Sequence, residues 1–459
     1  MLDLRVVGGT VVSGRRSEQL DVGVRDGQVV GLYSPGAAPD ARETVEAGQL
    51  LVLPGIVDAH FHCRAPGHPE REDFDSGTQA AAAGGATTVL EMPIAWPGVH
   101  NAAILRERRQ LGEQQAHVDF ALWGGGGSDA ESDIRGMADE GAIGYKIFLH
   151  AAPAGREKEF EGLTAVDNAS LFRALNRIRS TGLPIAIHSE DDELIQSFTS
   201  DLRAAGDTSP AAHERSRPDF VEAVAVSKVL LMAEALGARI HFPHISTAKA
   251  VQMVADAKRR GLPVTLETCP HYLLFDDSAV EKLGPFAKIN PPLRPRVNQD
   301  ALWAGIAAGT VDIVASDHAP YKFEEKEVGW KDIFAAPAGS PSIETMGPVL
   351  WDAAFSGRLT LNRAVELLSE RPAEIFGLAP RKGFLTPGAD ADFVLLDPSA
   401  HWTVRVDELL TRSKRSAQLF EGRTFRGRIQ ATYLRGAPAC RAGQIQNDQG
   451  AGRFVHPKR

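Results

Sequence analysis

Six side chains that can bind metal ions each close a short apolar segment of the chain. His60 and His62 stand two residues apart at the end of the run Pro54–His62. Residues two apart in a β-strand point to the same face, so one strand can direct both imidazoles at one ion. Taken alone, the pair fits polar contacts at a strand end equally well. The candidates that favour a metal site are Lys146, His188, His244 and Asp317.

Lys146 is the unexpected member of this set. An ammonium group beside two cations is strongly disfavoured and would lose its proton. The neutral amine can react with carbon dioxide to give a carbamate, whose two oxygens can span metal ions about 3.5–4 Å apart. Four imidazoles and Asp317 supply the remaining ligands. We therefore expect two divalent ions, with carboxylated Lys146 as the anionic bridge between them.

Two metal ions in this setting predict a hydrolase. They lower the pKa of a bound water towards roughly 7, so that a bridging hydroxide is available at neutral pH. One ion can polarise a substrate carbonyl while Asp317 takes the proton of the hydroxide and passes it to the leaving nitrogen. Asp317 is thus expected to be both a metal ligand and the catalytic base and acid, and the bond cleaved is amide-like.

The apolar segments alternate with amphipathic stretches long enough for helices, as in parallel β/α units. Eight such units predict a (β/α)8 barrel, the TIM barrel of the α/β class, in which reactive residues gather at the carboxyl ends of the strands. The predicted strands are Leu51–His62, Thr87–Met92, Val118–Trp123, Gly144–Leu149, Pro184–His188, Arg239–His244, Pro263–Thr268 and Val311–Ser316.

Glycines and a capping pattern mark the expected helix boundaries. Ser128 with Glu131 predicts a capping box that opens one helix. Glycine accepts the left-handed conformation that ends a helix, and it stands just before several of the predicted strands. The glycines expected to end helices in this way are Gly182, Gly237, Gly261 and Gly309.

Both ends of the chain differ from the barrel in pattern. Asp26-Gly27 marks a hairpin near the N-terminus, and short strand-like runs recur after residue 381. Neither end has enough strands for a stable sheet, so we expect both to form one small β-sandwich. The expected divisions are 1–52 and 381–459 for the sandwich and tail, and 53–380 for the metal-dependent barrel. The polar stretch Asn447–Arg459 is expected to be ordered only against another subunit.

The composition indicates a protein that handles small molecules. Hydrophobic residues make up 43% and charged residues 24% of the 459-residue chain, as in ordinary α/β proteins. The net charge of −9 argues against nucleic acid as a partner, since phosphate binding needs a basic surface. Three scattered cysteines favour a reducing compartment. With no signal-like N-terminus and no apolar run of about 18 residues, a cytoplasmic location and no membrane contact are expected.

The chain resembles the cyclic amidohydrolases of the amidohydrolase superfamily, which include dihydroorotases, allantoinases, dihydropyrimidinases and hydantoinases. The resemblance covers nearly the whole chain, and jointly its motifs are very specific. They are Pro54–His62, Phe74–Thr88, Gly144–Phe148, Glu267–Tyr272, Asn290–Arg294, Ser316–Pro320, and Pro372-Ala373 with Ile375–Leu378.

The resemblance implies an arrangement of ligands and a cofactor. It implies a small cyclic amide as substrate, opened at a C–N bond, and a barrel with a split β-sandwich. Zinc is the usual metal of these relatives, and a homotetramer or homodimer is expected. The implied ligands are His60, His62 and Asp317 on one ion and His188 and His244 on the other, with carboxylated Lys146 between them.

The choice of substrate is where the chain departs from some of these relatives. Dihydroorotases hold the substrate carboxylate with an arginine two residues after the second metal histidine, an asparagine after a Met-Pro motif, and a histidine after an Asp-x-Ala-Pro motif. This chain keeps Arg64 but has Ile94 and Tyr321 at the other positions. Dihydroorotase is therefore the alternative function. Arg64 fits a salt bridge to Glu70 or Glu72 about as well as a substrate contact.

A five-membered cyclic ureide of hydantoin or allantoin type is the leading substrate. D-type hydantoinases carry a tyrosine where this chain has Ala151, whereas L-type hydantoinases and allantoinases look similar at Glu91–Ile94. Ala338 departs from hydantoinases, which place an asparagine there. Asn290 is expected to pair with the ring amide or to fix the turn that follows it. His318 is expected to shape its loop or to contact substrate.

Two functions of other kinds stay open. Some members of the superfamily keep the fold as a non-catalytic scaffold and lose the metal ligands, whereas every ligand is present here. A deaminase with a single metal ion on the same barrel would have no need of Lys146. Metal content and the effect of replacing Lys146 separate these alternatives from a two-metal hydrolase.

Overall fold

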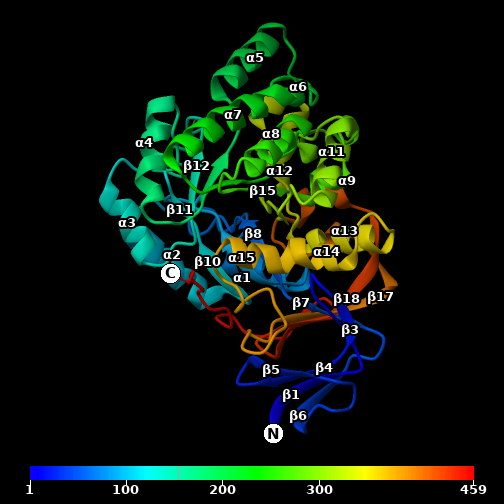
Figure 1. Cartoon of the computed structure of the whole chain (residues 1–459). Helices are drawn as coiled ribbons and strands as arrows, with labels where there is room; N and C mark the ends of the chain where they lie inside the picture. The colour runs from blue at the N-terminus through cyan, green and yellow to red at the C-terminus, as the bar shows by residue number, and fades with distance from the viewer. Residues whose placement is uncertain (154, 459) are drawn as a thin grey trace.

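The structure is a computed structural model that describes residues 1–153 and 155–458. Figure 1 shows two parts, a barrel of strands surrounded by helices and a smaller β-domain that contains the N-terminus. The C-terminus does not end in the β-domain; it returns to the barrel beside α2 (Ala102–Gln115). The chain therefore begins in the β-domain and ends on the barrel.

Parallel strands form the barrel in the order of the sequence. Each strand pairs in parallel with the next, and the short β11 (Gly124–Gly125) continues β10 to pair with β12. A parallel bridge between Phe61 and His318 closes the ring. The predicted TIM barrel is confirmed. Its strands are β8 (Ile56–Phe61), β9 (Ala86–Glu91), β10 (Asp119–Leu122), β12 (Tyr145–Phe148), β13 (Ile185–His188), β14 (Ile240–Phe242), β15 (Val264–Thr268) and β16 (Ile313–Val314).

The first predicted strand, 51–62, is two strands in the structure. β7 (Leu51–Pro54) pairs with β17 (Phe393–Thr403) in the β-domain, and β8 starts after Gly55. A Cβ atom at Gly55 would lie 2.1 Å from Oγ1 of Thr87, so only glycine allows this close approach. The sequence does not show this change of sheet, because both strands are buried and together read as one continuous apolar run.

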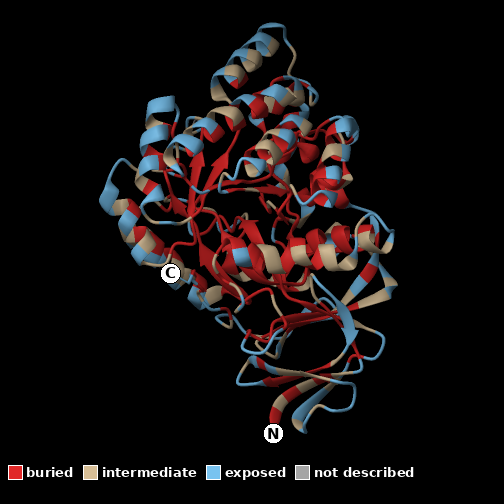
Figure 2. Ribbon diagram, in the orientation of Figure 1, coloured by how far each residue is buried: buried red, intermediate tan, exposed pale blue. Residues whose placement is uncertain are grey.

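Helices cover the outside of the barrel, with their outer faces exposed and the strands buried beneath them (Figure 2). Those that follow barrel strands are α1 (Phe74–Ala83), α2, α3 (Glu131–Asp139), α4 (Asn168–Arg179), α7 (Asp219–Leu236), α8 (Ala248–Arg259), α11 (Arg296–Ala307) and α13 (Ile343–Phe355). The loops carry α5 (Asp192–Ala204), α6 (Ala212–Arg215), α9 (Pro270–Leu274), α10 (Ser278–Leu283), α12 (Phe323–Glu327), α14 (Leu361–Val365) and α15 (Arg371–Ile375).

Helix ends follow the glycine pattern but not the predicted capping box. All four predicted glycines have a positive φ, from 64° at Gly237 to 83° at Gly261, and lie at helix ends. The capping box is wrong, because α3 begins after Ala130 with no side-chain cap. Ser128 instead accepts the Ala130 amide and donates its hydroxyl to Asp133. Its side chain closes the turn before the helix.

A cluster of buried residues fills the barrel. It joins Ala59 of β8 to Ala186 of β13, on opposite sides of the ring, and extends to Phe376 and Val455. Phe376 lines a cavity together with Pro184 and Arg239, which precede β13 and β14. This end of the barrel, at the amino ends of the strands, is therefore closed by side chains, and the carboxyl ends are left for a site.

Two sheets from both ends of the chain form the β-domain. The first has the order β5-β4-β1-β6 and the second β20-β19-β18-β17-β7-β2-β3, with a shared apolar core. The predicted sandwich built from both ends is confirmed, and so is the hairpin, where Asp26 and Gly27 both have positive φ. The remaining strands are β1 (Leu2–Val7), β2 (Thr10–Val12), β3 (Ser17–Gln19), β4 (Asp21–Arg25), β5 (Gln28–Tyr33), β6 (Ala41–Glu46), β18 (Thr424–Leu434), β19 (Ala437–Arg441) and β20 (Gln444–Ile445).

The C-terminal tail is ordered against its own barrel, contrary to the prediction that another subunit orders it. The Val455 amide donates to the carbonyl of Phe120 at 2.8 Å, and the Phe120 amide donates to Arg453 at 3.0 Å. Val455 is fully buried. The ring of Phe454 also packs on Phe120, with centroids 5.7 Å apart, so a few apolar residues anchor a tail that is otherwise polar.

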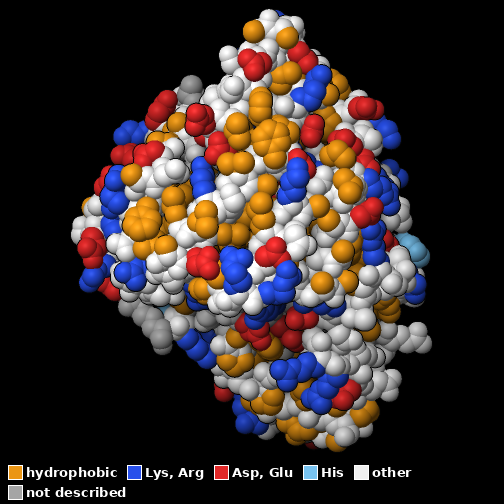
Figure 3. All heavy atoms as spheres, turned by 45° about the horizontal axis from the view of Figure 1, so that its top comes forward, with side chains coloured by type: hydrophobic (Ala, Val, Ile, Leu, Met, Phe, Trp, Pro, Cys, Tyr) orange, Lys and Arg blue, Asp and Glu red, His pale blue; other side chains and the backbone are white. Residues whose placement is uncertain are grey.

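The outer face of the helices mixes apolar side chains with charges of both signs (Figure 3). Some apolar side chains of α7 are well exposed, among them Leu231 at 69%. Among the described residues, no helix combines the length and the apolar character that crossing a bilayer requires.

Candidate active site

The predicted metal ligands meet at the carboxyl ends of the barrel strands. His60 lies on β8 with His62 just after it, Lys146 on β12 and His188 at the end of β13. The loops after β14 and β16 add His244 and Asp317. All are buried except Asp317, which is partly exposed. The position is the one at which (β/α)8 barrels place their active sites.

Short distances join these side chains into one cluster. Nε2 of His60 and of His62 lie 3.4 and 3.7 Å from Oδ1 of Asp317. Nε2 of His244 lies 3.2 Å from Nδ1 of His188 and 3.5 Å from Nζ of Lys146. The ring centroids of His60 and His244 are 5.2 Å apart, which connects the two halves. All six donor groups are thus close enough to share ions.

Buried carboxylates orient two histidines, one in each half of the cluster. Nδ1–H of His60 donates to Glu267 at 2.9 Å, and Nε2–H of His188 donates to Glu190 at 2.8 Å. Each bond fixes the tautomer and leaves the other ring nitrogen, Nε2 of His60 and Nδ1 of His188, free to bind a metal. Different nitrogens of the two rings therefore face the cluster.

Glu267 ties several parts of the site together. It accepts hydrogen bonds from His60, from Nε2–H of His241 at 3.1 Å and from the backbone amide of His244 at 3.2 Å. Burial alone would raise the pKa of Glu267, but His60 and His241 outweigh it and hold the pKa far below its usual range. Glu267 is therefore a fixed negative charge beneath the cluster.

The donor set fits divalent metal ions, because its histidines are uncharged. Burial lowers the pKa of His60 and of His188 to about 4, so both rings are neutral at pH 7. Burial also holds the pKa of His62 and of His244 well below its usual value, and Nε2 of these rings faces the cluster, 3.7 Å from Asp317 and 3.5 Å from Lys146. Neutral imidazoles with inward lone pairs are the form that metal ions require.

The charged members of the cluster have strongly shifted pKa values. Burial lowers the pKa of Lys146 from 10.5 to about 8, which makes the neutral amine accessible near neutral pH. Burial raises the pKa of Asp317, against the lowering effect of Lys146. A buried carboxylate ionises more readily beside cations. Asp317 therefore needs positive charge at the site in order to act as a base.

Backbone strain concentrates at this site. Among the described residues, six other than glycine have positive φ, and three of them, Arg64, His244 and Asp317, belong to the cluster or its pocket. The carboxylate of Asp58 accepts the Ser316 amide at 2.8 Å and so anchors the loop that carries Asp317. Such conformations persist where the surroundings fix them, and they are common at functional sites.

A pocket of about 120 Å³ opens above the cluster. Five of the six predicted substrate residues line it together with the metal ligands: Arg64, Ile94, Asn290, Tyr321 and Ala338. Oδ1 of Asn290 is buried without a hydrogen-bond partner among the described residues. It is therefore available to accept a hydrogen bond from a ligand.

His318 is the exception, and its predicted substrate contact is not supported. Its buried ring stacks on Phe61 with centroids 5.2 Å apart, and Nδ1 accepts the Ser342 amide at 3.2 Å. Nε2–H faces Glu72 at 3.3 Å. Both nitrogens have partners outside the pocket, so His318 shapes its loop, the other role considered for it.

Arg64 makes no ion pair with Glu70 or Glu72. Glu70 contacts His68, and Glu72 accepts hydrogen bonds from the 411–412 segment and from Ser76. Nε and Nη1 of Arg64 are buried and unpartnered among the described residues. Its guanidinium lies 4.8 Å from the ring centre of Tyr321. The salt-bridge interpretation is therefore wrong, and Arg64 can bind a ligand.

In the loop after β12 the sequence analysis considered only Ala151 and missed three residues of the pocket. His150, Arg156 and Phe160 from this loop line the pocket. Arg156 forms an ion pair with Glu159 at 2.5 Å and lies 5.9 Å from the ring centre of Tyr321. The loop carries a run of charges that is typical of an exposed segment, and no motif marks it. Only its length, between a strand and a distant helix, indicated a role.

The buried carboxylates were missed as well. Glu190 and Glu267 each stand at the end of an apolar strand segment, where a charge needs a partner. A glutamate at the end of an apolar segment was therefore the sequence feature that could have indicated these two carboxylates. Cys269 and His271 also lie close to Asp317, within 4.8 Å of one another by their ligand atoms, and had no predicted role.

The chain is similar over nearly its whole length to known proteins. The chain is 39% identical to the allantoinase of Rubrobacter xylanophilus over all of this chain and 98% of that protein. It is 34% identical to the dihydroorotase of Methanothermobacter thermautotrophicus over 96% of this chain and 95% of that protein.

A solved structure of an L-hydantoinase (dihydropyrimidinase) from Arthrobacter aurescens superposes with a TM-score of 0.95 at 33% identity. The match covers 99% of this chain and all of that one. The family model described as the amidohydrolase family matches residues 51–438, from β7 to β19. With a metal-type cluster at the mouth of a barrel and similarity along its whole length, the chain belongs to the amidohydrolase family.

Proposed function

We propose that this protein is a metal-dependent hydrolase that opens a five-membered cyclic ureide of hydantoin or allantoin type. The observation that carries the proposal is the convergence of four neutral imidazoles, Lys146 and Asp317 at the carboxyl ends of the barrel strands. Allantoinases and hydantoinases among the relatives support the substrate class.

Two divalent ions, which we propose to be zinc, would be held by His60, His62 and Asp317 on one side and by His188 and His244 on the other. Lys146 would lie between them as a carbamate, because its lowered pKa makes the neutral amine available to carbon dioxide. When bound, the ions would polarise the scissile carbonyl and lower the pKa of a water towards roughly 7.

Asp317 would transfer the proton in this reaction. Its carboxylate lies 3.4 Å from the His60 ring and borders the pocket, so it is close to the water and to the substrate. It would accept the proton of the attacking water and deliver it to the ring nitrogen that leaves. The amide bond breaks as that nitrogen is protonated, and the product is the open ureido acid.

The pocket residues suit a polar cyclic ureide. Oδ1 of Asn290 would accept an N–H of the ring, and the unpartnered N–H groups of Arg64 would donate to an oxygen of the ring or of its substituent. Buried donors and acceptors that lack partners discriminate strongly against ligands that cannot satisfy them. Ile94 forms an apolar side of the same pocket.

Dihydroorotate is the second candidate substrate. The observation that favours it is Arg64, which is buried, unpaired and directed at the pocket, as a carboxylate-binding arginine would be. Against it, Ile94 cannot donate a hydrogen bond, and Tyr321 lies under the arginine as an aromatic surface. The scaffold alternative fits less well, because a scaffold does not need six converging ligands.

We also propose the setting in which the enzyme works. Exposed apolar side chains on one side of α7, Phe220, Val224 and Leu231, support a homotetramer or homodimer. Three buried cysteines that form no disulfide support a cytoplasmic location. We further propose that residues 53–380 form the barrel domain and that residues 1–52 and 381–459 form the β-sandwich and the tail.

A substrate panel tests the proposal. The zinc-loaded enzyme is incubated with allantoin, 5-substituted hydantoins, dihydropyrimidines and dihydroorotate, and ring opening is followed by chromatography. A five-membered ureide should give the highest kcat/KM. Lys146→Ala should lose this activity, and a short carboxylate such as propionate should restore part of it, while the exposed Lys158→Ala keeps it. Higher kcat/KM with dihydroorotate would establish the second candidate instead.

A further inference from the structure

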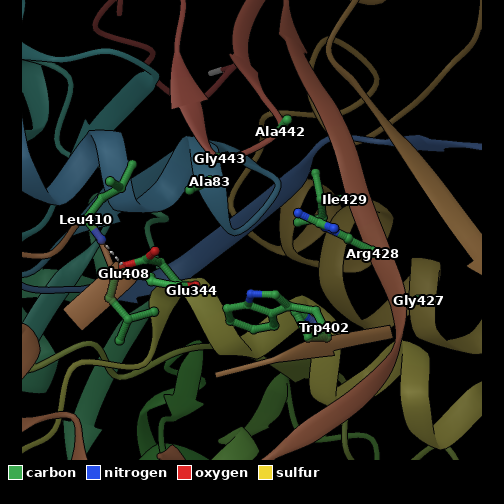
Figure 4. Close-up of a pocket in the computed structure, with 12 residues that line it drawn as sticks. Ala83, Glu344, Trp402, Glu408, Leu410, Gly427, Arg428, Ile429, Ala442 and Gly443 are labelled. Atoms are coloured by element: carbon green, nitrogen blue, oxygen red, sulfur yellow. Dashed lines mark hydrogen bonds between the residues drawn. The ribbon is translucent and has the colours of Figure 1, made fainter. Parts of the chain in front are cut away.

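A second cavity, of about 230 Å³, lies between the barrel and the strands β17 and β18. Its walls come from α13, from the 408–410 segment and from the two strands (Figure 4). None of the residues that line it also lines the pocket above the metal-type cluster. A ligand in this cavity would therefore not occupy the catalytic pocket.

Glu344, the second residue of α13, is the chemical centre of this cavity. Its side chain is buried, and Oε1 accepts the amides of Leu410 at 2.9 Å and Thr411 at 3.2 Å. Oε2 accepts no hydrogen bond from the described residues, and no lysine or arginine among them forms an ion pair with Glu344. A buried carboxylate normally has a partner for each oxygen. One oxygen is thus left for a ligand.

No lysine or arginine among the described residues pairs with Glu344, and Lys414 lowers its pKa only from a distance. Burial raises the pKa of Glu344 to about 8, and Glu72 pushes in the same direction against the two backbone amides. A buried charge is stabilised when an opposite charge pairs with it. The cavity is therefore electrostatically suited to a cation that donates hydrogen bonds.

The other walls support the same class of ligand. Figure 4 shows the indole of Trp402 on β17 beside Glu344, with Ile429 on the neighbouring strand β18. An indole attracts cations through its face and also packs against apolar groups. Glu408, also in the lining, is exposed and forms no ion pair within the described chain, and it adds negative charge. Arg428 also lines the cavity, but it is exposed, so its repulsion of a cation acts through solvent and is screened by salt.

We propose that this cavity binds a small organic cation, an amidinium-type or ammonium group attached to an apolar group. The charged end donates hydrogen bonds to Oε2 of Glu344, and the apolar part packs between Trp402 and Ile429. The same chemistry is offered by the arginine or lysine side chain of a second copy of the chain. The experiment below separates a free ligand from this second source.

Calorimetric titration with a matched pair of probes tests the proposal. Benzylguanidine is positively charged, and benzylurea has nearly the same shape without the charge. The full-length, metal-loaded protein should bind benzylguanidine at one saturable site and benzylurea about tenfold more weakly or worse, as expected for loss of a hydrogen-bonded charge pair. Equal affinity for the two probes would overturn the proposal.

Substitutions place the binding in this cavity. Glu344→Gln keeps an acceptor for the two amides and removes the charge, so it should abolish the preference for benzylguanidine. Trp402→Leu keeps an apolar wall and should also weaken binding of this probe. Glu408→Gln, at the exposed edge, should change the affinity by less than about fivefold. Circular dichroism and unchanged ring-opening activity confirm that each variant is folded.

Sedimentation of the wild type and Glu344→Gln separates the two sources. A free ligand leaves the assembly unchanged while benzylguanidine binding is lost. A smaller assembly in Glu344→Gln identifies the side chain of a second copy as the natural occupant, which also supports the proposal. If benzylguanidine does not bind to the wild type and the assembly is unchanged, or if Glu344→Gln and Trp402→Leu both bind it like the wild type, the proposal is wrong.

Discussion

Individual carboxylates determine which ring nitrogen of a histidine faces the cluster. Glu190 and Glu267 each accept an N–H from one imidazole and hold the other nitrogen of that ring toward the cluster. The ligands themselves could be predicted from the sequence, because His60 and His62 share a strand face and the others close equivalent segments. The carboxylates were not predicted, because their partners, which include Arg217 for Glu190 and the His244 amide for Glu267, become evident only in the fold.

Replacing Glu267 by glutamine should weaken metal binding without unfolding the protein. The amide keeps the shape of the side chain, but it removes the negative charge that supports His60 and His241. Loss of such a partner lowers metal affinity by about 10- to 100-fold. A zinc titration of the metal-free protein measures this, with the exposed Glu113→Gln as control. Unchanged affinity would show that Glu267 has only a structural role.

Reactivation of the metal-free enzyme should depend on pH through Lys146. Burial lowers its pKa from 10.5 to about 8, and only the neutral amine reacts with carbon dioxide. Below pH 8 the neutral fraction falls as the pH falls. At fixed dissolved carbon dioxide and zinc, the reactivation rate should rise by about tenfold per pH unit up to pH 8 and then level off. A rate independent of pH would contradict a carbamate that forms at Lys146.

At the scale of elements, the pocket depends on loops that buried lysines hold together. Nζ of Lys326, on α12, donates to the carbonyls of Lys288 at 2.9 Å and Gly339 at 2.6 Å. The Gly339 amide donates to the same Lys288 carbonyl. These bonds join the segment before Asn290 to the loop that carries Ala338. Two sides of the pocket are thus fixed to each other.

Lys326→Met should disturb substrate binding more than chemistry. Methionine fills the space but leaves the Gly339 carbonyl without its donor, at a cost of about 1–3 kcal/mol. We expect KM to rise several-fold with a smaller change in kcat, because the metal ligands lie on other segments. Steady-state kinetics measure both, and Lys331→Met, at an exposed position, is the matched control. A loss confined to kcat would contradict this role.

Barrel strands could be predicted as elements because apolar runs and glycine stops recur at regular spacing. The change of sheet at Gly55 could not, since β7 and β8 are both buried and only the close approach to Thr87 separates them. The capping prediction at Ser128 failed for a related reason. A serine near a helix start can cap the helix or close the turn before it, and the local sequence is the same in both cases.

On the scale of the whole molecule, distant parts of the chain close the barrel and leave one end open. The tail reaches Phe120 at the start of β10, and Val455 joins the interior cluster beside Phe376. This contact links the C-terminus to the end of the barrel away from the pocket. The polar composition of the tail predicted the opposite, because only a few of its side chains, Val455 and Phe454 among them, pack on the barrel.

Val455→Ala should therefore destabilise the fold without affecting the site. Removing two buried methyl groups and leaving a cavity costs about 2 kcal/mol. Denaturant unfolding of the metal-loaded protein measures this loss, and KM should stay unchanged because the residue lies at the other end of the barrel. His456→Ala, exposed and adjacent, should cost far less. A change in KM with no loss of stability would contradict the assigned position.

The most direct measurement is a crystal structure of the enzyme grown with zinc and bicarbonate, with anomalous scattering to locate the ions. We predict two zinc peaks about 3.5–4 Å apart, one beside His60 and His62 and the other beside His188 and His244. Density beyond Nζ of Lys146 should show a carbamate in contact with both peaks. A single ion, or two ions with Lys146 ending in a bare amine, would contradict the two-metal site.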